Sequence, residues 1–222
     1  MRAKAFTLAE VLITLGIIGI IAALTIPRLI VNYQKHVTIN KVKKFYTEMN
    51  QVMQYSIAEN GEYSTWDFSL HSYEFYTKYF EKYLKRVTSV QKGIQVHCDF
   101  LNGVRVIFSD GTQMIFSTVS NYMTHFVVKK SNESAPVLIF YTSAKKYENI
   151  FGFDIKPTRE RFYFTISEKG IIEPPNINAT RTSNLSSCKN NNICAGDDNN
   201  GHQECSTLIY KDEWSISDDY PW

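Results

Sequence analysis

Glu10 is an acidic residue within an otherwise apolar segment near the N-terminus, where residues 6–26 read FTLAEVLITLGIIGIIAALTI. A carboxylate on a membrane helix costs about 2–3 kcal/mol or more and usually marks a function. If the chain is cut between Ala5 and Phe6, the new α-amino group is positive near neutral pH. Glu10 then lies one helical turn beyond this amine. In a packed array of helices, the Glu10 carboxylate of one subunit can pair with the Phe6 amine of its neighbour and fix their register.

The apolar segment is long enough to cross a membrane as a helix. At about 1.5 Å per residue, residues 6–26 reach roughly 30 Å, which is the thickness of the hydrocarbon core. Two other interpretations remain open: a cleaved signal peptide with small residues at Ala22 and Ala23, and a plain membrane anchor. Neither of them explains the acidic side chain of Glu10.

Three residues within this helix bear on its packing. Gly16 and Gly19 permit the close approach of another helix or a local loosening, although their spacing differs from that of a GxxxG motif. Pro27 lacks an amide donor, so we expect a kink in the helix at this position.

The N-terminal residues resemble those of the type IV pilin superfamily, which comprises pilins and the pseudopilins of type II secretion. Residues 1–5 form a short basic leader, which ends in Ala5 where the family usually has Gly. Phe6 and Thr7 follow the cleavage site, and Glu10 is the fifth residue of the mature chain. The rest of the motif is the apolar helix with Gly16, Gly19 and Pro27.

The resemblance implies a structural, non-enzymatic subunit of a type IV pilus or of a type II secretion pseudopilus. In that family, a prepilin peptidase cuts the leader on the cytoplasmic side and N-methylates the new terminus, here Phe6. The apolar helix first holds the subunit in the inner membrane and later packs in the filament core. The implied partners are inner-membrane lipid, prepilin peptidase and other pilin or pseudopilin subunits. The implied location is the bacterial inner membrane, with a cytoplasmic N-terminus and a periplasmic head, or the cell surface once a pilus has assembled.

The basic residues on their own favour the opposite orientation. The leader has only Arg2 and Lys4, whereas the stretch between Pro27 and Glu48 is basic and contains no acid. Positive charge gathers on the cytoplasmic side of membrane helices, but long domains translocate largely regardless of it. We therefore still expect a periplasmic head. The basic residues of the stretch are Arg28, Lys35, Lys41, Lys43 and Lys44.

We expect four regions along the chain: a leader at residues 1–5, a hydrophobic helix at 6–27, an amphipathic continuation of the helix at 28–60, and a globular head at 61–222. Apolar residues recur at helical spacing in the continuation, and Asn60-Gly61 predicts its end. The apolar face consists of Val42, Phe45, Met49, Val52, Met53, Ser56 and Ile57.

The head shows the signals of an antiparallel β-meander over about residues 94–173. Apolar residues alternate after Gly93, and the dipeptides Asn102-Gly103 and Asp110-Gly111 predict hairpin turns. We expect four or five strands packed on the amphipathic half of the long helix, which makes the fold α+β and pilin-like. An aromatic-rich helix over residues 72–85 is expected to pack in the core rather than to bind sugars or nucleic acid.

The polar segment 176–206 is rich in Asn and Ser and is expected to be a loop stapled by disulfides. The four cysteines allow three pairings, and we favour two bridges, one of which ties the loop to a strand cysteine. A zinc site that includes His202 is a weaker alternative, because its ligand spacing fits no common zinc motif. The four cysteines are Cys98, Cys188, Cys194 and Cys205.

Calcium is the other metal considered for this segment, with Asp197 and Asp198 as weak candidate ligands. The acidic run lacks the residue order of an EF-hand loop, so we expect a solvated loop and no cofactor.

Composition excludes several other classes of protein. The chain has 222 residues, of which 44% are hydrophobic and 21% are charged, a globular rather than a disordered profile. Its net charge of +2 is too small for a broad nucleic-acid footprint, so no nucleic-acid partner is expected. The sequence contains no GxSxG, GxxxxGK[ST], HExxH or GxGxxG motif. The alternative function is a membrane-anchored or minor-pilin binding module, which recognises a surface, a sugar or DNA.

Overall fold

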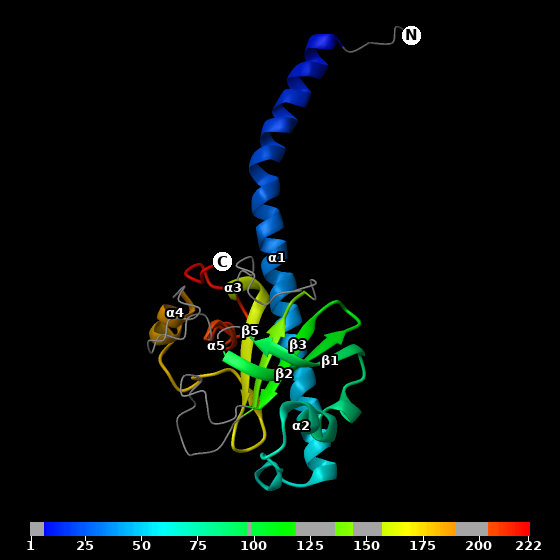
Figure 1. Cartoon of the computed structure of the whole chain (residues 1–222). Helices are drawn as coiled ribbons and strands as arrows, with labels where there is room; N and C mark the ends of the chain where they lie inside the picture. Colours follow the sequence, from blue (N-terminus) through cyan, green and yellow to red (C-terminus); the bar gives the residue numbers. More distant parts are fainter. Residues whose placement is uncertain (1–6, 97–98, 119–135, 144–156, 190–203) are drawn as a thin grey trace. The chain divides into compact units, whose positions relative to one another are not determined.

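The computed structural model describes residues 7–96, 99–118, 136–143, 157–189 and 204–222. The chain forms two compact units, Met1–Val37 and Thr38–Trp222. Helix α1 (Leu8–Asn60) contributes to both units and is followed by an antiparallel six-stranded sheet, so the fold class is α+β (Figure 1).

The first unit consists of the N-terminal part of α1, which continues as a helix through Pro27. Its apolar side chains are largely exposed, for example 78% for Leu8 and 75% for Leu24. By length and composition, this helix is suited to cross a membrane. The expectation of a long apolar N-terminal helix is confirmed.

In the second unit, α1 has one buried face that begins at Thr38, ten residues after Arg28, where the amphipathic segment was expected to start. The helix ends at Asn60, as predicted. Gly61 has a φ of 84° and donates its N–H to the Ile57 carbonyl at 3.0 Å. It therefore caps the C-terminus of the helix with a residue in the left-handed backbone conformation. The buried residues of this part are Thr38, Ile39, Val42, Phe45, Met49, Val52, Met53 and Ser56.

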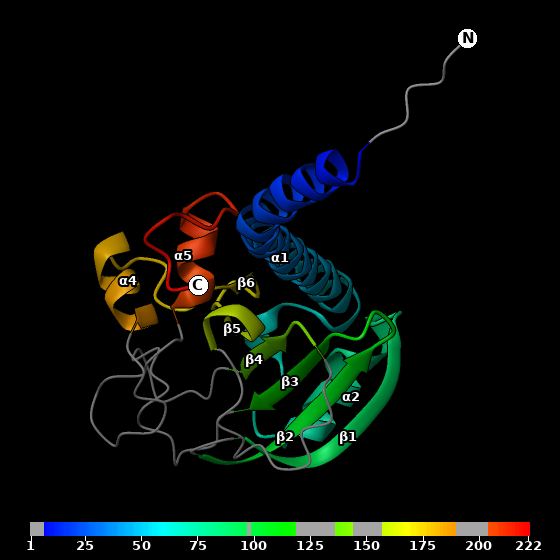
Figure 2. The same cartoon turned by 90° about the horizontal axis from the view of Figure 1, so that it is seen from above.

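The sheet is an antiparallel meander in which the spatial order of the six strands follows the sequence (Figure 2). It has one strand more than the upper number expected, because the short strand at Ile172–Glu173 pairs with the strand before it; the first strand also begins earlier than expected, before Gly93. The strands are β1 (Val87–Val96), β2 (Asp99–Phe108), β3 (Gln113–Thr118), β4 (Pro136–Tyr141), β5 (Arg161–Ile166) and β6 (Ile172–Glu173).

One of the two predicted hairpin turns is wrong. Asn102 and Gly103 lie inside β2, where they pair with Gln95 and Ile94 of β1. The second turn is confirmed, because Gly111 has a φ of 75° and lies between β2 and β3.

The core lies between one face of the sheet and the helices. Phe45 of α1 stacks on Phe140 of β4 with ring centroids 4.4 Å apart. Helix α2 (Ser72–Tyr79) contributes Phe75, whose ring lies 5.7 Å from that of Phe116 on β3. Fully burying such a side chain contributes roughly 1.5–3 kcal/mol. Four of the six aromatic side chains of the predicted helix are buried in the core, as expected. The helix is shorter than predicted because a separate 3-10 turn, Glu81–Tyr83, follows it.

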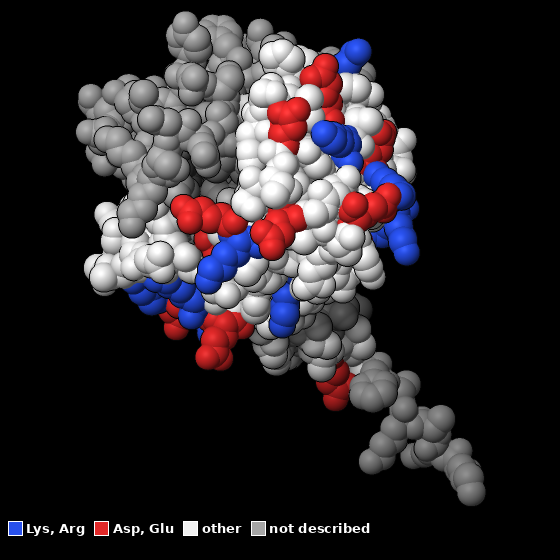
Figure 3. All heavy atoms as spheres, turned by 90° about the horizontal axis from the view of Figure 1, so that it is seen from below, with Lys and Arg blue, Asp and Glu red and all other residues white. Residues whose placement is uncertain are grey.

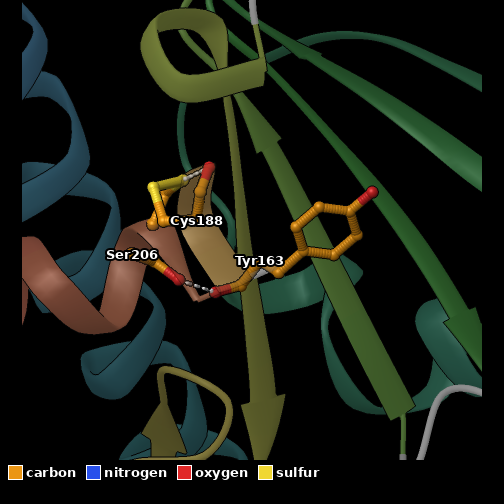
Figure 4. The surroundings of a disulfide bond; sticks show 4 residues. Tyr163, Cys188 and Ser206 are labelled. Atoms are coloured by element: carbon orange, nitrogen blue, oxygen red, sulfur yellow. Dashed lines mark hydrogen bonds between the residues drawn. A yellow bond between two sulfur atoms is a disulfide. The ribbon is translucent and has the colours of Figure 1, made fainter. Parts of the chain in front are cut away.

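The prediction of a loop over residues 176–206 is wrong in part, because this segment contains helix α4 (Arg181–Lys189) and the start of helix α5 (Cys205–Lys211). A short helix α3 (Pro157–Glu160) precedes β5. The disulfide Cys188–Cys205 joins α4 to α5 (Figure 4). The hydroxyl of Ser206 donates to the Tyr163 carbonyl at 2.6 Å and so ties α5 to β5. The C-terminal region is therefore a packed pair of helices and not only a stapled loop.

Candidate functional site

Glu10 forms a reciprocal cap with Thr7 at the start of α1. The Oε2 atom of Glu10 accepts hydrogen bonds from the Thr7 amide at 2.8 Å and from the Thr7 hydroxyl at 2.9 Å. The Thr7 hydroxyl in turn accepts from the Glu10 amide at 3.3 Å. This is a capping box, in which two side chains satisfy amides that have no partner within the helix. The pattern Thr-x-x-Glu at residues 7–10 could have predicted it, but the sequence reasoning considered only a partner outside the chain.

The cap leaves half of the carboxylate available for another contact. Both bonds from Thr7 end on Oε2, and among the described residues none bonds to Oε1. The side chain of Glu10 is exposed. A cation from another chain can therefore reach Oε1 without displacing Thr7. Ala5 and Phe6, which form the predicted cleavage site, lie outside the described residues.

The two glycines of α1 leave open space on the helix surface. A Cβ atom built at Gly16 or Gly19 would have no heavy atom within 4 Å outside its immediate helical surroundings. Their backbones are thus accessible to a second helix. Pro27, the predicted kink, lies eight residues beyond Gly19 within the same continuous helix.

An ion-pair network in the second unit fastens α1 to the sheet. The guanidinium of Arg86 bonds both oxygens of Glu48 on α1 and also donates to Asp110 at 2.6 Å. Lys44 reaches the same Asp110 oxygen at 3.1 Å. Burial alone would raise the pKa of Asp110, but hydrogen bonds from Thr112, Arg86 and Lys44 lower it well below its usual value.

A small cavity lies beside this network and has a volume of about 120 Å³. Sites for drug-sized ligands have volumes of about 300–1,000 Å³, so this cavity is small for such a molecule. On the face shown in Figure 3, acidic and basic side chains of the described residues are interspersed. The cavity is lined by Glu48, Gln51, Val52, Tyr55, Tyr83, Leu84, Lys85, Arg86 and Phe108.

A second network holds the C-terminal residues on α4. Arg181 donates to Asp212 at 2.7 Å and to Asp219 at 2.8 Å, and it also contacts the Ser217 hydroxyl at 2.8 Å. The hydrogen bonds from Arg181 and Ser217 lower the pKa of Asp219 well below its usual value. The Arg181 guanidinium therefore holds the C-terminal residues at both Asp212 and Asp219.

The predicted cysteine and metal sites are only partly within the described residues. Cys188 and Cys205 are bonded to each other with their Cα atoms 4.9 Å apart, which removes both from the zinc alternative. Of the described residues, no group of three or more His, Cys, Asp or Glu is placed to hold a metal ion. The other predicted members, Cys98, Cys194, Asp197 and Asp198, lie outside the described residues.

Comparison with known proteins gives one family. Searches of curated proteins and of solved structures gave no match. The model of a family of unknown function, DUF6613, matches residues 28–222. These residues begin directly after Pro27 and include the sheet and the α-helices of the described residues, except the apolar part of α1. Because this match extends over most of the chain, the protein belongs to DUF6613, a family of unknown function.

Proposed function

We propose that the chain is a prepilin-like structural subunit of a type IV pilus or of a type II secretion pseudopilus. In this proposal, prepilin peptidase removes residues 1–5 and methylates the Phe6 amine. The mature chain remains in the inner membrane through α1 until it joins a filament of like subunits. Its role is structural and non-catalytic, with the N-terminus in the cytoplasm and the head in the periplasm.

The observation that carries the proposal is the division of α1 into two chemically different parts. Up to Val37 its apolar side chains are largely exposed, and from Thr38 onward one face is buried in the core of the second unit. A row of exposed apolar side chains requires lipid or other helices as its surroundings. A membrane before assembly and a bundle of identical helices after assembly both meet this requirement.

Glu10 supplies the register of the proposed filament. Surrounded by apolar helices, its carboxylate needs a positive partner, and the Phe6 amine of the next subunit provides one. Thr7 holds one carboxylate oxygen through the helix cap, and the other oxygen is directed to no described residue. Thr7 thus orients Glu10 in the free subunit, and the amine binds to it during assembly.

The binding-module alternative receives less support from the described residues. The aromatic residues that motivated it are largely core: Phe75, Tyr76 and Phe80 are each fully buried. They are not available to stack on a sugar or a base. We therefore retain the filament subunit as the proposed function.

Mass spectrometry of the native N-terminus tests the proposal. We expect a chain that begins at Phe6 with one added methyl group, and loss of Arg2 and Lys4 takes the net charge from +2 to 0 (24 − 22 = 2; 2 − 2 = 0). The matched control is the same chain from cells that lack prepilin peptidase, which should still begin at Met1. Isolated fibres that contain chains beginning at Met1 would contradict the proposal.

A further inference from the structure

A cationic and aromatic segment directly follows the apolar part of α1. Arg28 and Tyr33 are exposed, 68% for Tyr33, and Lys35 is partly exposed. No described residue forms a hydrogen bond or ion pair with Arg28 or Lys35. The chain has no acidic residue between Glu10 and Glu48 to neutralise them. Two positive charges in the first unit are therefore unpaired among the described residues.

The other lysines of the basic stretch are engaged in the second unit or lie within it. Lys41 donates to the Thr142 carbonyl at 2.9 Å, and Lys44 pairs with Asp110 at 3.1 Å. Lys43 is exposed but belongs to the second unit. Arg28 and Lys35 therefore belong to the first unit, whereas Lys41 and Lys44 form contacts within the second unit.

The positions of these residues along α1 match the layers of a bilayer. From Leu8 to Ile26 the helix rises about 27 Å at 1.5 Å per residue, close to the thickness of the hydrocarbon core. Arg28 lies two residues beyond Ile26. Lys35 lies about 10 Å further along the helix, at the outer side of a headgroup region that is about 5–8 Å deep. Residues seven apart share a helix face, so both cations project from the same side. Tyr33 lies between them, and Tyr is enriched at membrane interfaces.

We propose that Arg28 and Lys35 bind the phosphate groups of anionic lipids in the leaflet nearer the head, with Tyr33 at the interface. The guanidinium of Arg28 suits a phosphate because it offers paired donors. The proposal rests on the membrane insertion of α1 proposed above, but it requires neither cleavage nor filament assembly.

Native mass spectrometry of the full chain in a neutral detergent tests the proposal by titration with phosphatidylglycerol and, separately, with phosphatidylcholine. We expect tighter binding of phosphatidylglycerol. A basic residue near an anionic surface contributes about 1 kcal/mol, which is about fivefold in affinity, so R28Q and K35Q should each weaken phosphatidylglycerol binding about fivefold. The double variant should weaken it about 25-fold, and added salt should diminish the difference.

K43Q is the matched control, because it removes the same charge from an exposed position of α1 in the second unit. It should change the affinity for phosphatidylglycerol less than twofold. An unchanged affinity in the double variant, or an equal loss in K43Q, would overturn the proposal. The same titration also records whether the unchanged chain forms dimers. If the double variant no longer formed such dimers but kept its affinity for phosphatidylglycerol, the proposal would be overturned, because the two cations would then contact an acidic residue of a second copy.

The membrane insertion of α1 is measured in a separate experiment, so that a failure of the lipid site can be distinguished from a failure of the proposed membrane anchor. The full chain is reconstituted in vesicles of phosphatidylcholine and phosphatidylglycerol and washed with alkaline carbonate. Retention of the chain together with equal binding of both lipids would contradict only the lipid site. Release of the chain would overturn both the lipid site and the proposed membrane anchor.

Discussion

The side-chain amide of Asn50 on α1 completes the hydrogen bonding of Ile172 on the edge strand β6. Its Nδ2 donates to the Ile172 carbonyl at 3.0 Å, and its Oδ1 accepts from the Ile172 amide at 3.0 Å. The other side of β6 pairs with β5. Asn50 thus occupies the place of a further strand, and it both fastens the helix to the sheet and protects an edge that could otherwise pair with another chain.

Replacing Asn50 with Ala should destabilise the second unit. The change leaves a donor and an acceptor of the partly buried β6 backbone without a protein partner, which costs about 1–3 kcal/mol. Urea unfolding of the full chain in detergent, followed by circular dichroism, measures the loss. Asn40→Ala is the control, because Asn40 is exposed on the same helix, and we expect a change within about 0.5 kcal/mol. Equal effects of the two variants would show that the amide bridge does not stabilise the fold.

The ion-pair network around Asp110 should make the stability of the second unit dependent on pH. Its folded-state pKa lies below the unfolded value of about 3.9. The stabilisation by the carboxylate is therefore complete above this value and is lost as the pH falls towards the folded-state pKa. Unfolding free energies measured from pH 7 downward should show a deficit for Asp110→Asn that shrinks below about pH 4. Asp218→Asn changes an exposed carboxylate near the C-terminus and should show a smaller deficit at pH 7.

The Cys188–Cys205 bridge should contribute measurably to stability. The two residues are separated by 17 positions, and both are fully buried. The double variant Cys188→Ser, Cys205→Ser should lose about 2–4 kcal/mol, which lowers Tm on the order of 10 °C. Thermal unfolding measures this loss, and Ser186→Ala on the exposed side of α4 is the control. Non-reducing peptide mapping that finds other partners for these two cysteines would contradict the assignment.

Glu10 variants should separate the helix cap from the proposed pairing with the Phe6 amine. Glu10→Gln keeps an oxygen that can accept from Thr7 but removes the charge, so we expect loss of filament incorporation with the helix start preserved. Thr7→Ala removes the cap at a cost of about 1 kcal/mol to the helix but leaves the charge, and Thr7→Ser restores the cap. Quantitative blotting of sheared fibres against membrane-retained chain measures incorporation. Normal incorporation of Glu10→Gln would exclude charge pairing as the device that sets the register.

Local signals in the sequence were reliable where the structure depends on local physics. The apolar repeat through Val42, Phe45 and Met49 predicted the buried face of α1, because a helix of fixed period presents these positions on one side. Gly61 and Gly111 adopt positive φ at a helix end and at a turn, where glycine has the least strain. Neither prediction required knowledge of distant residues.

Local sequence signals gave wrong predictions where contacts between residues far apart in the sequence determined the structure. Asn102-Gly103 is a typical turn dipeptide, but the ladder with β1 holds both residues in extended β2. Helix α4 has a polar sequence in which Asn184 and Cys188 are buried, so its stability depends on α5 and the disulfide rather than on an apolar repeat. Periodicity therefore gave no sign of it.

The sequence by itself determined that a long helix has an apolar first half with one acid, and that an antiparallel sheet follows. These properties depend on the hydrophobic period and on helix length, both of which follow from the order of the residues. Only the tertiary structure decided that Cys188 pairs with Cys205 and that Asn50 closes the edge at Ile172. The pairing of the two cysteines and the bridge from Asn50 to β6 depend on which residues come within a few ångströms of each other after folding, and spacing along the chain does not fix that. The bond between Thr7 and the Glu10 carboxylate is local, because the two residues are three positions apart, and the Thr-x-x-Glu pattern is sufficient to predict it.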